Sequence, residues 1–503
     1  MIRRHATSEM THAGLDRHRR ITGSELGRTG LHVSQAGFGG YRINAGGAEH
    51  AAALQHALVS GIDLMDTSAN YADGGSEELV GQVLTHMVDS GELRRQAVVV
   101  VSKAGYLQGR NHTLSQERRR QGRPFAELVP YADGLDHCIH PEFLEDQLTR
   151  ALERLRLETI DVYLLHNPEY YLGWAAHNGL DPSAAQAEYD RRIANAFRHL
   201  ETEVTRGRIR WYGISSNTFP APASDPQFTC LERVWELAES IGPEHHFGVV
   251  QLPMNLYEDG AVLLANQPSG MTALEFARQK NLGVLINRPL NAFTENRLLR
   301  LADVDAAESL PAAEIEKRIE TFEGAEQAFA RHILPEMGLD LGLAPRVQAQ
   351  FLSADAIRRA WGSLSGYEHW RQVRDEYLLP RIRGVLEFLE TRLPGTDAVA
   401  AWKDDYLAAL DSVLRAVDGF YAEAAAAKAK TIASALAAAD PDWGGNASLS
   451  QLAVRALRST AGISCVLVGM RRTAYVDDIL TELAAPVTRK DRKASWQKLH
   501  QFL

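Results

Sequence analysis

Four side chains of complementary chemistry lie at or just after the ends of short apolar runs in the N-terminal part of the chain. Asp66, Lys103 and His166 each end such a run, and Tyr71 follows Asp66 by five residues. A phenol with a pKa of ~10 is a poor acid near neutral pH, but an adjacent ammonium lowers that pKa and a carboxylate can hold the ammonium in place. An imidazole can hydrogen-bond a substrate carbonyl and orient it. Gathered at one place, these residues predict a site that donates a proton to a carbonyl group.

The elements that must position these residues are read from eight short apolar runs along the chain. Several are rich in β-branched residues with almost no polar alternation, which is typical of strands buried on both faces of a parallel sheet. The intervening stretches resemble helices, and residues 144, 148, 152 and 155 form one apolar face of a 3.6-residue period. The pattern predicts an α/β fold, a (β/α)8 TIM barrel, with strands at residues 35–39, 62–66, 97–103, 161–166, 210–215, 248–251, 282–287 and 464–469.

A doubly wound dinucleotide-binding sheet is the competing fold. It would place the pattern Gly-x-Gly-x-x-Gly after the first strand, at the start of a helix. Here the run Gly-Phe-Gly-Gly at 37–40 continues with Tyr-Arg-Ile and opens no clear helix. The barrel is therefore favoured, and its functional side chains are expected at the carboxyl ends of the strands.

The interval 295–447 breaks the regular spacing of the predicted strands. Its apolar stripe of Tyr406, Leu410, Val413 and Val417 indicates a helix, and the Ala-rich stretch 422–439 has high helix propensity. We expect an inserted all-helical subdomain. Two roles stay open for it, a cover over the mouth of the barrel and a contact surface for a homo-oligomer.

The remaining boundaries follow from the strands. Residues 20–294 are expected to hold strands one to seven, and residues 448–503 the last helix, strand eight and a C-terminal helix and tail. Residues 1–19 are rich in Arg and His and lack the apolar segment of a secretory signal. They are predicted to be a disordered tail.

Composition and charge exclude several classes of protein. With 503 residues, 45% of them hydrophobic, the chain has enough apolar material for a large core. A net charge of −10 argues against nucleic acid as a partner. The sequence contains no run of 18 apolar residues, so no membrane span is predicted. Three cysteines without a CxxC pair favour a reducing compartment, the cytoplasm. The string His-Cys-Ile-His at 137–140 offers too few clustered ligands, so no metal site is predicted.

A set of motifs occurs in a fixed order at the predicted strand ends. With them, the chain resembles the aldo-keto reductase superfamily over residues 20–293 and 448–482. The motifs are Leu-Gly-Arg-Thr-Gly-Leu-His-Val-Ser at 26–34, Asp-Thr-Ser-Ala-Asn-Tyr at 66–71, Gly-Ser-Glu-Glu-Leu-Val-Gly at 75–81, Val-Ser-Lys at 101–103, Leu-Leu-His-Asn-Pro at 164–168, Gly-Ile-Ser-Ser-Asn at 213–217, Val-Gln-Leu-Pro at 250–253 and Val-Leu-Val-Gly-Met-Arg at 466–471.

The resemblance implies an NAD(P)H-dependent oxidoreductase that interconverts an aldehyde or ketone, with sugars among the candidates, and an alcohol. Tyr71 would be the general acid, Lys103 would lower its pKa, Asp66 would pair with Lys103, and His166 would orient the carbonyl. NADP(H) is the expected cofactor and NAD(H) the alternative. A small carbonyl or alcohol substrate is the expected partner.

The same resemblance implies a set of cofactor-binding positions. Ser215, Ser216 and Gln251 match positions that grip the nicotinamide carboxamide, and Arg471 with Arg472 could bind a 2′-phosphate. The complete set is Gly40, Tyr41, Asp66, Ser215, Ser216, Gln251, Asn287, Pro289, Leu290, Gly469, Arg471, Arg472 and Tyr475.

Three positions depart from the family pattern. Asn287 stands where an aromatic ring often stacks on the nicotinamide, Tyr475 where Arg or Gln is common, and Ile479 where Asn usually meets adenine. These departures leave open the choice between NADPH and NADH. They also leave open an alternative function, a barrel that binds the cofactor but serves as a catalytically weak regulatory or interaction subunit.

Overall fold

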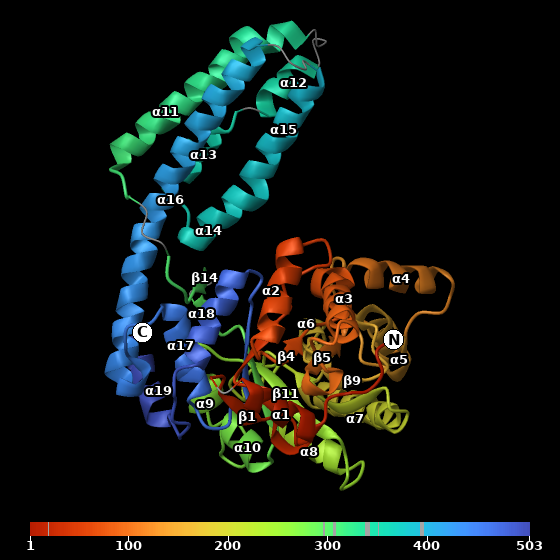
Figure 1. The fold of residues 1–503 in the computed structure, drawn as a ribbon. Coiled ribbons are helices and arrows are strands. Elements are labelled where there is room, and N and C mark those ends of the chain that lie inside the picture. Colours follow the sequence, from red (N-terminus) through yellow and green to blue (C-terminus); the bar gives the residue numbers. More distant parts are fainter. Residues whose placement is uncertain (19, 295–296, 305–307, 338–342, 351, 393–396) are drawn as a thin grey trace. The chain divides into compact units, whose positions relative to one another are not determined.

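The chain folds into two compact units, Met1–Ala292 with Ala435–Leu503 and, between these segments, Phe293–Ser434 (Figure 1). The structure is a computed structural model that describes residues 1–18, 20–294, 297–304, 308–337, 343–350, 352–392 and 397–503.

The first unit is built on a closed barrel of eight parallel strands, which confirms the predicted (β/α)8 fold. The last strand pairs with β12 on one side and with β3 on the other, so a segment distant in sequence closes the barrel. In order around the barrel the strands are β10 (Ile209–Ser215), β11 (Phe247–Pro253), β12 (Gly283–Asn287), β15 (Cys465–Val468), β3 (Ala36–Gly39), β4 (Leu64–Asp66), β5 (Val99–Ala104) and β9 (Ile160–His166).

A helix follows each barrel strand, and the second unit is inserted in the crossover from β12 to β15. The helix predicted from the 3.6-residue period is α5, which buries the apolar face named above and begins after His140, whose side chain accepts from the Glu142 amide. These helices are α2 (Ala48–Val59), α3 (Gly75–Asp89), α5 (Pro141–Leu155), α7 (Pro182–Thr205), α8 (Leu231–Glu239), α10 (Ala273–Gln279), α17 (Leu449–Arg458) and, after strand eight, α18 (Thr473–Leu483).

A β-hairpin packs against the amino-terminal end of the barrel. Strands β1 (Gly23–Glu25) and β2 (His32–Ser34) pair antiparallel, and Leu26 and Leu31 between them are buried. These two side chains join one apolar cluster with inward-facing barrel residues such as Val101 and Leu285. The Arg28 amide donates to the Asn281 carbonyl just before β12 at 2.6 Å. The opposite, carboxyl-terminal end of the barrel carries the long loops.

Those loops contain short elements of their own. After β5 come β6 (Tyr106–Leu107), α4 (Gly109–Arg120), β7 (Val129–Ala132) and β8 (Leu135–His137), of which the strands form a sheet in the order β6-β8-β7. Helix α6 (Tyr170–His177) follows β9, α9 (Gly260–Leu263) follows β11, and α19 (Lys493–Phe502) ends the chain.

The N-terminal segment differs from the predicted disordered tail. Helix α1 (Ser8–Arg17) is capped by Thr7, whose side chain accepts from the Met10 amide. The Ala6 amide donates to the carboxylate of Asp161, 155 residues away, at 2.7 Å, and Thr11 is buried. The order comes from these tertiary contacts, which the local composition of the segment does not reveal.

The second unit has its own hydrophobic core. Its helices are α11 (Ala312–Ala328), α12 (Leu343–Gln350), α13 (Ala354–Ala360), α14 (Tyr367–Gln372), α15 (Leu379–Arg392) and the greater part of α16 (Asp397–Ala439). The predicted stripe is buried in this core at Tyr406, Leu410, Val413 and Val417.

Two features of the insertion differ from the prediction. It is not all-helical, because it opens with a two-stranded sheet of β13 (Asn291–Thr294) and β14 (Arg297–Arg300), runs too short to show a period in the sequence. It also ends at Ser434 rather than at 447. Residues just beyond α16 pack with the barrel unit, because Trp443 lies 5.1 Å from the Trp496 ring and donates its Nε1–H to Ser459 Oγ at 3.0 Å.

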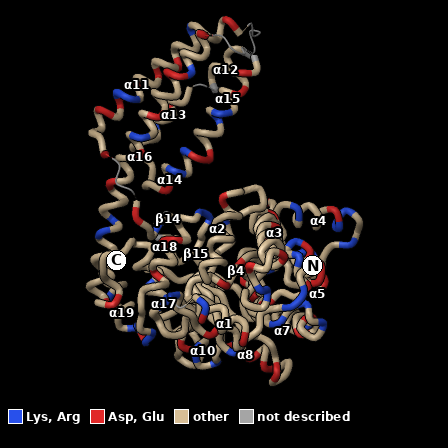
Figure 2. Tube along the Cα trace, viewed as in Figure 1, with Lys and Arg blue, Asp and Glu red and all other residues tan. Residues whose placement is uncertain are grey.

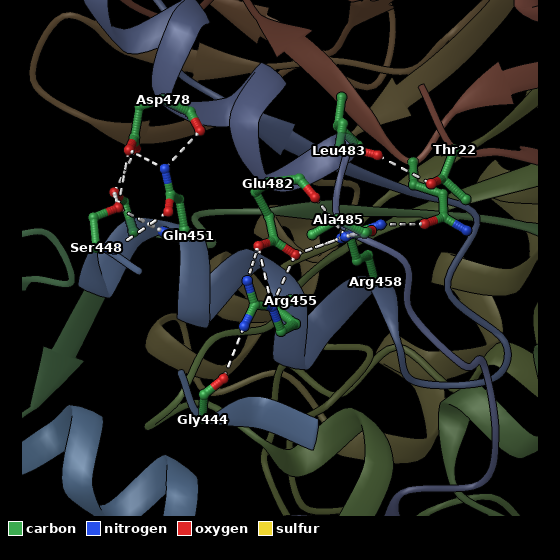
Figure 3. Close-up of polar contacts among 12 residues, drawn as sticks. Thr22, Gly444, Ser448, Gln451, Arg455, Arg458, Asp478, Glu482, Leu483 and Ala485 are labelled. Atoms are coloured by element: carbon green, nitrogen blue, oxygen red, sulfur yellow. Dashed lines mark hydrogen bonds and ion pairs between the residues drawn. The ribbon is translucent and has the colours of Figure 1, made fainter. Parts of the chain in front are cut away.

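The helices on either side of strand eight are joined by buried ion pairs (Figure 3). Glu482 on α18 accepts from Arg455 and Arg458 on α17, and both Glu482 and Arg458 have side chains without solvent exposure. Asp478 accepts from Gln451 Nε2 at 2.8 Å and from Ser448 Oγ at 2.9 Å. These contacts hold the C-terminal half of α18 against α17.

Charged residues of both signs are interspersed along α11 and the neighbouring helices (Figure 2). Among the described helices, none is long and apolar enough to cross a membrane.

Candidate active site

Three strand ends and the turn after one of them bring the four predicted catalytic residues together. Asp66 is the last residue of β4, Lys103 lies near the end of β5, and His166 is the last residue of β9. Tyr71 begins the 3-10 turn η2 (Tyr71–Gly74), which follows β4 and leads into α3. Because the strands are parallel, their carboxyl ends meet at one mouth of the barrel.

Lys103 is the centre of this group. Its Nζ lies 2.8 Å from Asp66 Oδ2, 2.9 Å from the Thr67 carbonyl oxygen and 3.1 Å from Tyr71 Oη. The side chain has no solvent exposure, so these three acceptors satisfy the three N–H groups of the ammonium. Since an ammonium only donates, Tyr71 Oη accepts from Lys103, and the phenolic hydrogen of Tyr71 is left for another acceptor.

The net pKa of Tyr71 is raised by burial, although Lys103 acts in the expected, lowering direction. Burial raises the pKa of this phenol and Asp66 adds to the rise, while the charge and hydrogen bond of Lys103 lower it without cancelling the effect of burial. For Lys103, burial lowers the pKa, but the neighbouring Asp66 and Tyr71 outweigh burial, and the net pKa is raised. Lys103 therefore remains a cation, and Tyr71 remains a neutral phenol near pH 7.

His166 faces the same group as a neutral ring. Burial, together with the charges of Lys103 and His137, holds the pKa of His166 well below its usual value. Its ring centroid lies 6.0 Å from that of Tyr71 and 4.6 Å from that of Tyr106, both edge-on. His137, part of the string considered for metal binding, has Nε2 2.8 Å from the His166 carbonyl oxygen.

Asp66 is held by a second partner besides Lys103. Gln251 Nε2 donates to Asp66 Oδ1 at 2.8 Å, and Ser215 Oγ donates to Gln251 Oε1 at 3.0 Å. Ser216 Oγ lies 3.1 Å from Thr218 Oγ1. The positions expected to grip a carboxamide thus connect β10 and β11 to the catalytic group.

The other expected cofactor positions lie in three loops. The Gly40 amide donates to the Asp66 carbonyl at 2.8 Å, and the next residue, Tyr41, is 64% exposed, with its ring centroid 5.2 Å from that of Tyr71. Asn287 ends β12, and Pro289 and Leu290 follow it. Asn287 Oδ1 is buried without a hydrogen-bond partner in the part of the chain that the structure describes.

The loop after strand eight holds the remaining positions. Gly469 is exposed, and Arg471 and Arg472 follow it at the start of α18. Arg472 Nε lies 3.4 Å from Glu49 Oε1, and its guanidinium lies 5.9 Å from the Tyr475 ring centroid. Ile479 is buried, which places this side chain in the core and not toward a ligand.

Sequence reasoning did not single out Ser68, Tyr106 or Tyr170. Ser68 is buried with Oγ 3.1 Å from His166 Nδ1, and the Tyr106 and Tyr170 rings meet edge-on at 5.2 Å beside His166. The position of Ser68 two residues after Asp66 could have marked it in the sequence. Its contact with His166, 98 positions away, could not be read from the sequence.

The described residues contain no group of three or more His, Cys, Asp or Glu side chains that could hold a metal ion.

Comparison with known proteins identifies the family. A model of the aldo/keto reductase family matches residues 36–297, just over half of the chain. The chain therefore belongs to the aldo/keto reductase family, a family of oxidoreductases.

Individual relatives are distant. The NADH-specific methylglyoxal reductase of Escherichia coli is 29% identical over 149 residues, 28% of this chain and 40% of that protein. Mouse aldo-keto reductase family 1 member A1 is 27% identical over 199 residues, 38% of this chain and 49% of its own. The chain thus matches less than half the length of these relatives. The structure of glycerol dehydrogenase from Gluconobacter oxydans has 17% identity and a TM-score of 0.46, covering 96% of this chain and 95% of that one.

Proposed function

We propose that the protein is a nicotinamide-dependent oxidoreductase that interconverts an aldehyde or ketone, sugars included, and the corresponding alcohol. The observation that carries this proposal is the hydrogen bonding of the buried Lys103 to both Asp66 and Tyr71. The proposed partner is a small carbonyl or alcohol, and its site is the barrel mouth.

In this proposal Tyr71 is the general acid of carbonyl reduction. Its Oη accepts from the Lys103 ammonium, so its own hydrogen points to the substrate oxygen. As the proton leaves, the negative charge on Tyr71 forms 3.1 Å from a buried cation, which stabilises the phenolate. Asp66 keeps that cation in place. Neutral His166 supplies a hydrogen bond that orients the carbonyl.

The cofactor we propose is NADP(H), with NAD(H) as the alternative. When bound, it would supply the hydride. The unpartnered buried Oδ1 of Asn287 fits an amide donor such as the nicotinamide carboxamide. Ser216 directly follows β10, which is two strands from β12 in the barrel order. Gly40, Tyr41, Pro289 and Leu290 would line the nicotinamide end. Gly469, Arg471, Arg472 and Tyr475 would hold the phosphate end.

A second candidate function is a barrel that binds the cofactor with little turnover and acts as an interaction subunit. The buried Ile479 favours it, because this side chain offers adenine no hydrogen bond.

The free thiols of Cys138, Cys230 and Cys465 support a reducing compartment, and we propose the cytoplasm. Self-association through the insertion also remains a proposal.

The preference between the cofactors is expected to depend on Arg471 and Arg472. A charge-assisted hydrogen bond to a 2′-phosphate contributes ~1.5–3 kcal/mol, roughly 10–150-fold in affinity. Replacing both residues by Ala should therefore weaken NADPH binding by that factor and leave NADH binding nearly unchanged. Titration with each cofactor, followed by nicotinamide fluorescence, measures both affinities. Equal losses for the two would refute the assignment.

Glu49→Gln is the matched control for this double variant. It removes the carboxylate that pairs with Arg472 but leaves both guanidinium groups in place. NADPH binding should become tighter for two reasons. Arg472 no longer has to leave the Glu49 carboxylate to bind the 2′-phosphate, and the negative charge of Glu49, which repels that phosphate, is gone. A loss of NADPH affinity in Glu49→Gln would show that the loop was disturbed and not that a phosphate contact was removed.

A further inference from the structure

The buried hydroxyl of Ser68 lies between the candidate active-site histidine and an asparagine side chain. Its Oγ is 3.1 Å from His166 Nδ1, 2.7 Å from Asn70 Oδ1 and 3.3 Å from the Lys103 carbonyl oxygen. Ser68 is 1% exposed, so water does not compete for these contacts. Asn70 in turn contacts Gln108, with Nδ2 3.4 Å from Oε1.

The direction of these hydrogen bonds decides what His166 can do. A neutral imidazole carries one hydrogen, on Nδ1 or on Nε2, and the nitrogen without it only accepts. The low pKa of His166 keeps the ring in this neutral form. A ring that must donate to a carbonyl through Nε2 therefore needs Nδ1 to be an acceptor.

Ser68 has a single hydrogen to give, and the Lys103 carbonyl oxygen, the most distant of its three contacts, already accepts from the Ala69 amide at 3.2 Å. If its hydroxyl donates to His166 Nδ1, the ring hydrogen is on Nε2. If the hydroxyl donates to Asn70 Oδ1, Nδ1 must donate to Ser68 Oγ, and Nε2 loses its hydrogen. The choice depends on Asn70, because a turn of its amide by 180° exchanges oxygen and nitrogen and presents N–H donors to Ser68.

We propose that Ser68 and Asn70 are positioning residues that fix His166 as the Nε2–H tautomer. The amide of Asn70 donates to Ser68 Oγ, the hydroxyl of Ser68 donates to His166 Nδ1, and Nε2–H is the donor to the substrate carbonyl. Gln108, with its own amide turned in the same way, completes the chain by donating from Nε2 to the turned Asn70 Oδ1. The choice of this orientation rests on the proposed function, because only the Nε2–H ring donates to the substrate carbonyl, whereas the tautomer can be measured without turnover.

The test begins with nitrogen NMR of the full-length protein labelled with ¹⁵N-histidine, without cofactor or substrate. The His166 signals are assigned from a His166→Asn spectrum and recorded at a pH where the ring is neutral. The wild-type spectrum should show a protonated Nε2 and an acceptor Nδ1. Signals from a protonated Nδ1 would overturn the proposal even if the enzyme is active.

Two variants change the chain in different ways. Ser68→Ala removes the donor to Nδ1, so the two tautomers should mix and kcat for carbonyl reduction should fall by about 2–10-fold. Asn70→Asp offers Ser68 only acceptor oxygens, so the hydroxyl should turn away from His166. That variant should show the Nδ1–H tautomer and lose ~10²-fold in kcat, as expected when one donor to a developing oxyanion is removed.

Ser68→Thr retains a hydroxyl and should restore the wild-type tautomer. A purely structural role for Ser68 predicts instead that the spectra of all variants keep the wild-type tautomer, with losses that follow thermal stability. Unchanged tautomers in both Ser68→Ala and Asn70→Asp would overturn the proposal. If the tautomers shift as stated but the wild type turns over no carbonyl, the chain of hydrogen bonds stands and the proposed function fails.

Discussion

Tyr71→Phe is expected to lower the rate of carbonyl reduction by ~10²–10⁴-fold, the usual contribution of a general acid. The substitution removes only Oη, which accepts from Lys103 at 3.1 Å. The ring, its edge-on contact with Tyr41 and the rest of the buried group remain. Steady-state kinetics should therefore show a loss in kcat, while a cofactor titration should give nearly the wild-type Kd.

The matched control is Tyr377→Phe, which removes a phenolic oxygen from an exposed side chain in the second unit. Its kinetics should equal those of the wild type. Near-full turnover by Tyr71→Phe on the best substrate would show that another group donates the proton.

Lys103→Met is expected to act through the pKa of Tyr71. Burial already raises this pKa and the ammonium opposes the rise, so its removal should raise the pKa further. Reduction needs the neutral phenol, which persists at low pH. The reduction rate should therefore fall at every pH, while the profile keeps its flat region at low pH. Alcohol oxidation needs the phenolate, so its activity limb should move to higher pH. Rate profiles measured against pH in both directions test this.

The same substitution leaves Asp66 buried without its cation. Removing one partner of a buried pair typically costs ~3–5 kcal/mol of stability, so the unfolding free energy must be measured beside the rates. The double variant Lys103→Met with Asp66→Asn removes both charges and should recover stability but not the pH profile. A pH profile that Lys103→Met leaves unchanged in both directions would contradict the coupling between Lys103 and Tyr71.

The barrel could be predicted because its strands are buried on both faces. Runs such as Val99–Val101 and Val162–Leu165 are therefore apolar, and a polar side chain, Lys103 or His166, follows each of them toward the barrel mouth. This regularity located Asp66, Lys103 and His166 without knowledge of any contact. The two-stranded sheet at 291–300 gave no such signal, because strands of four residues show too little pattern.

Other features depend on contacts between distant residues. Helix α1 is anchored through the bond from Ala6 to Asp161, and the insertion ends early because Trp443 packs on Trp496. The net pKa direction of Tyr71 required the extent of burial, which residue types alone do not give. The position of Ser68 beside His166 likewise emerged only when β4 and β9 were placed in one barrel.

We propose that this barrel positions a nicotinamide cofactor for hydride transfer to a carbonyl carbon, with Tyr71 as the acid. The most direct measurement uses nicotinamide cofactors deuterated at the transferable position and a panel of aldehydes, ketones and open-chain sugars. Mass spectrometry of the products then reports where the deuterium goes. We expect deuterium at the carbinol carbon of at least one product, with ~10²–10⁴-fold slower formation by Tyr71→Phe. Cofactor that binds but keeps its label with every member of the panel would contradict the account and favour the interaction subunit.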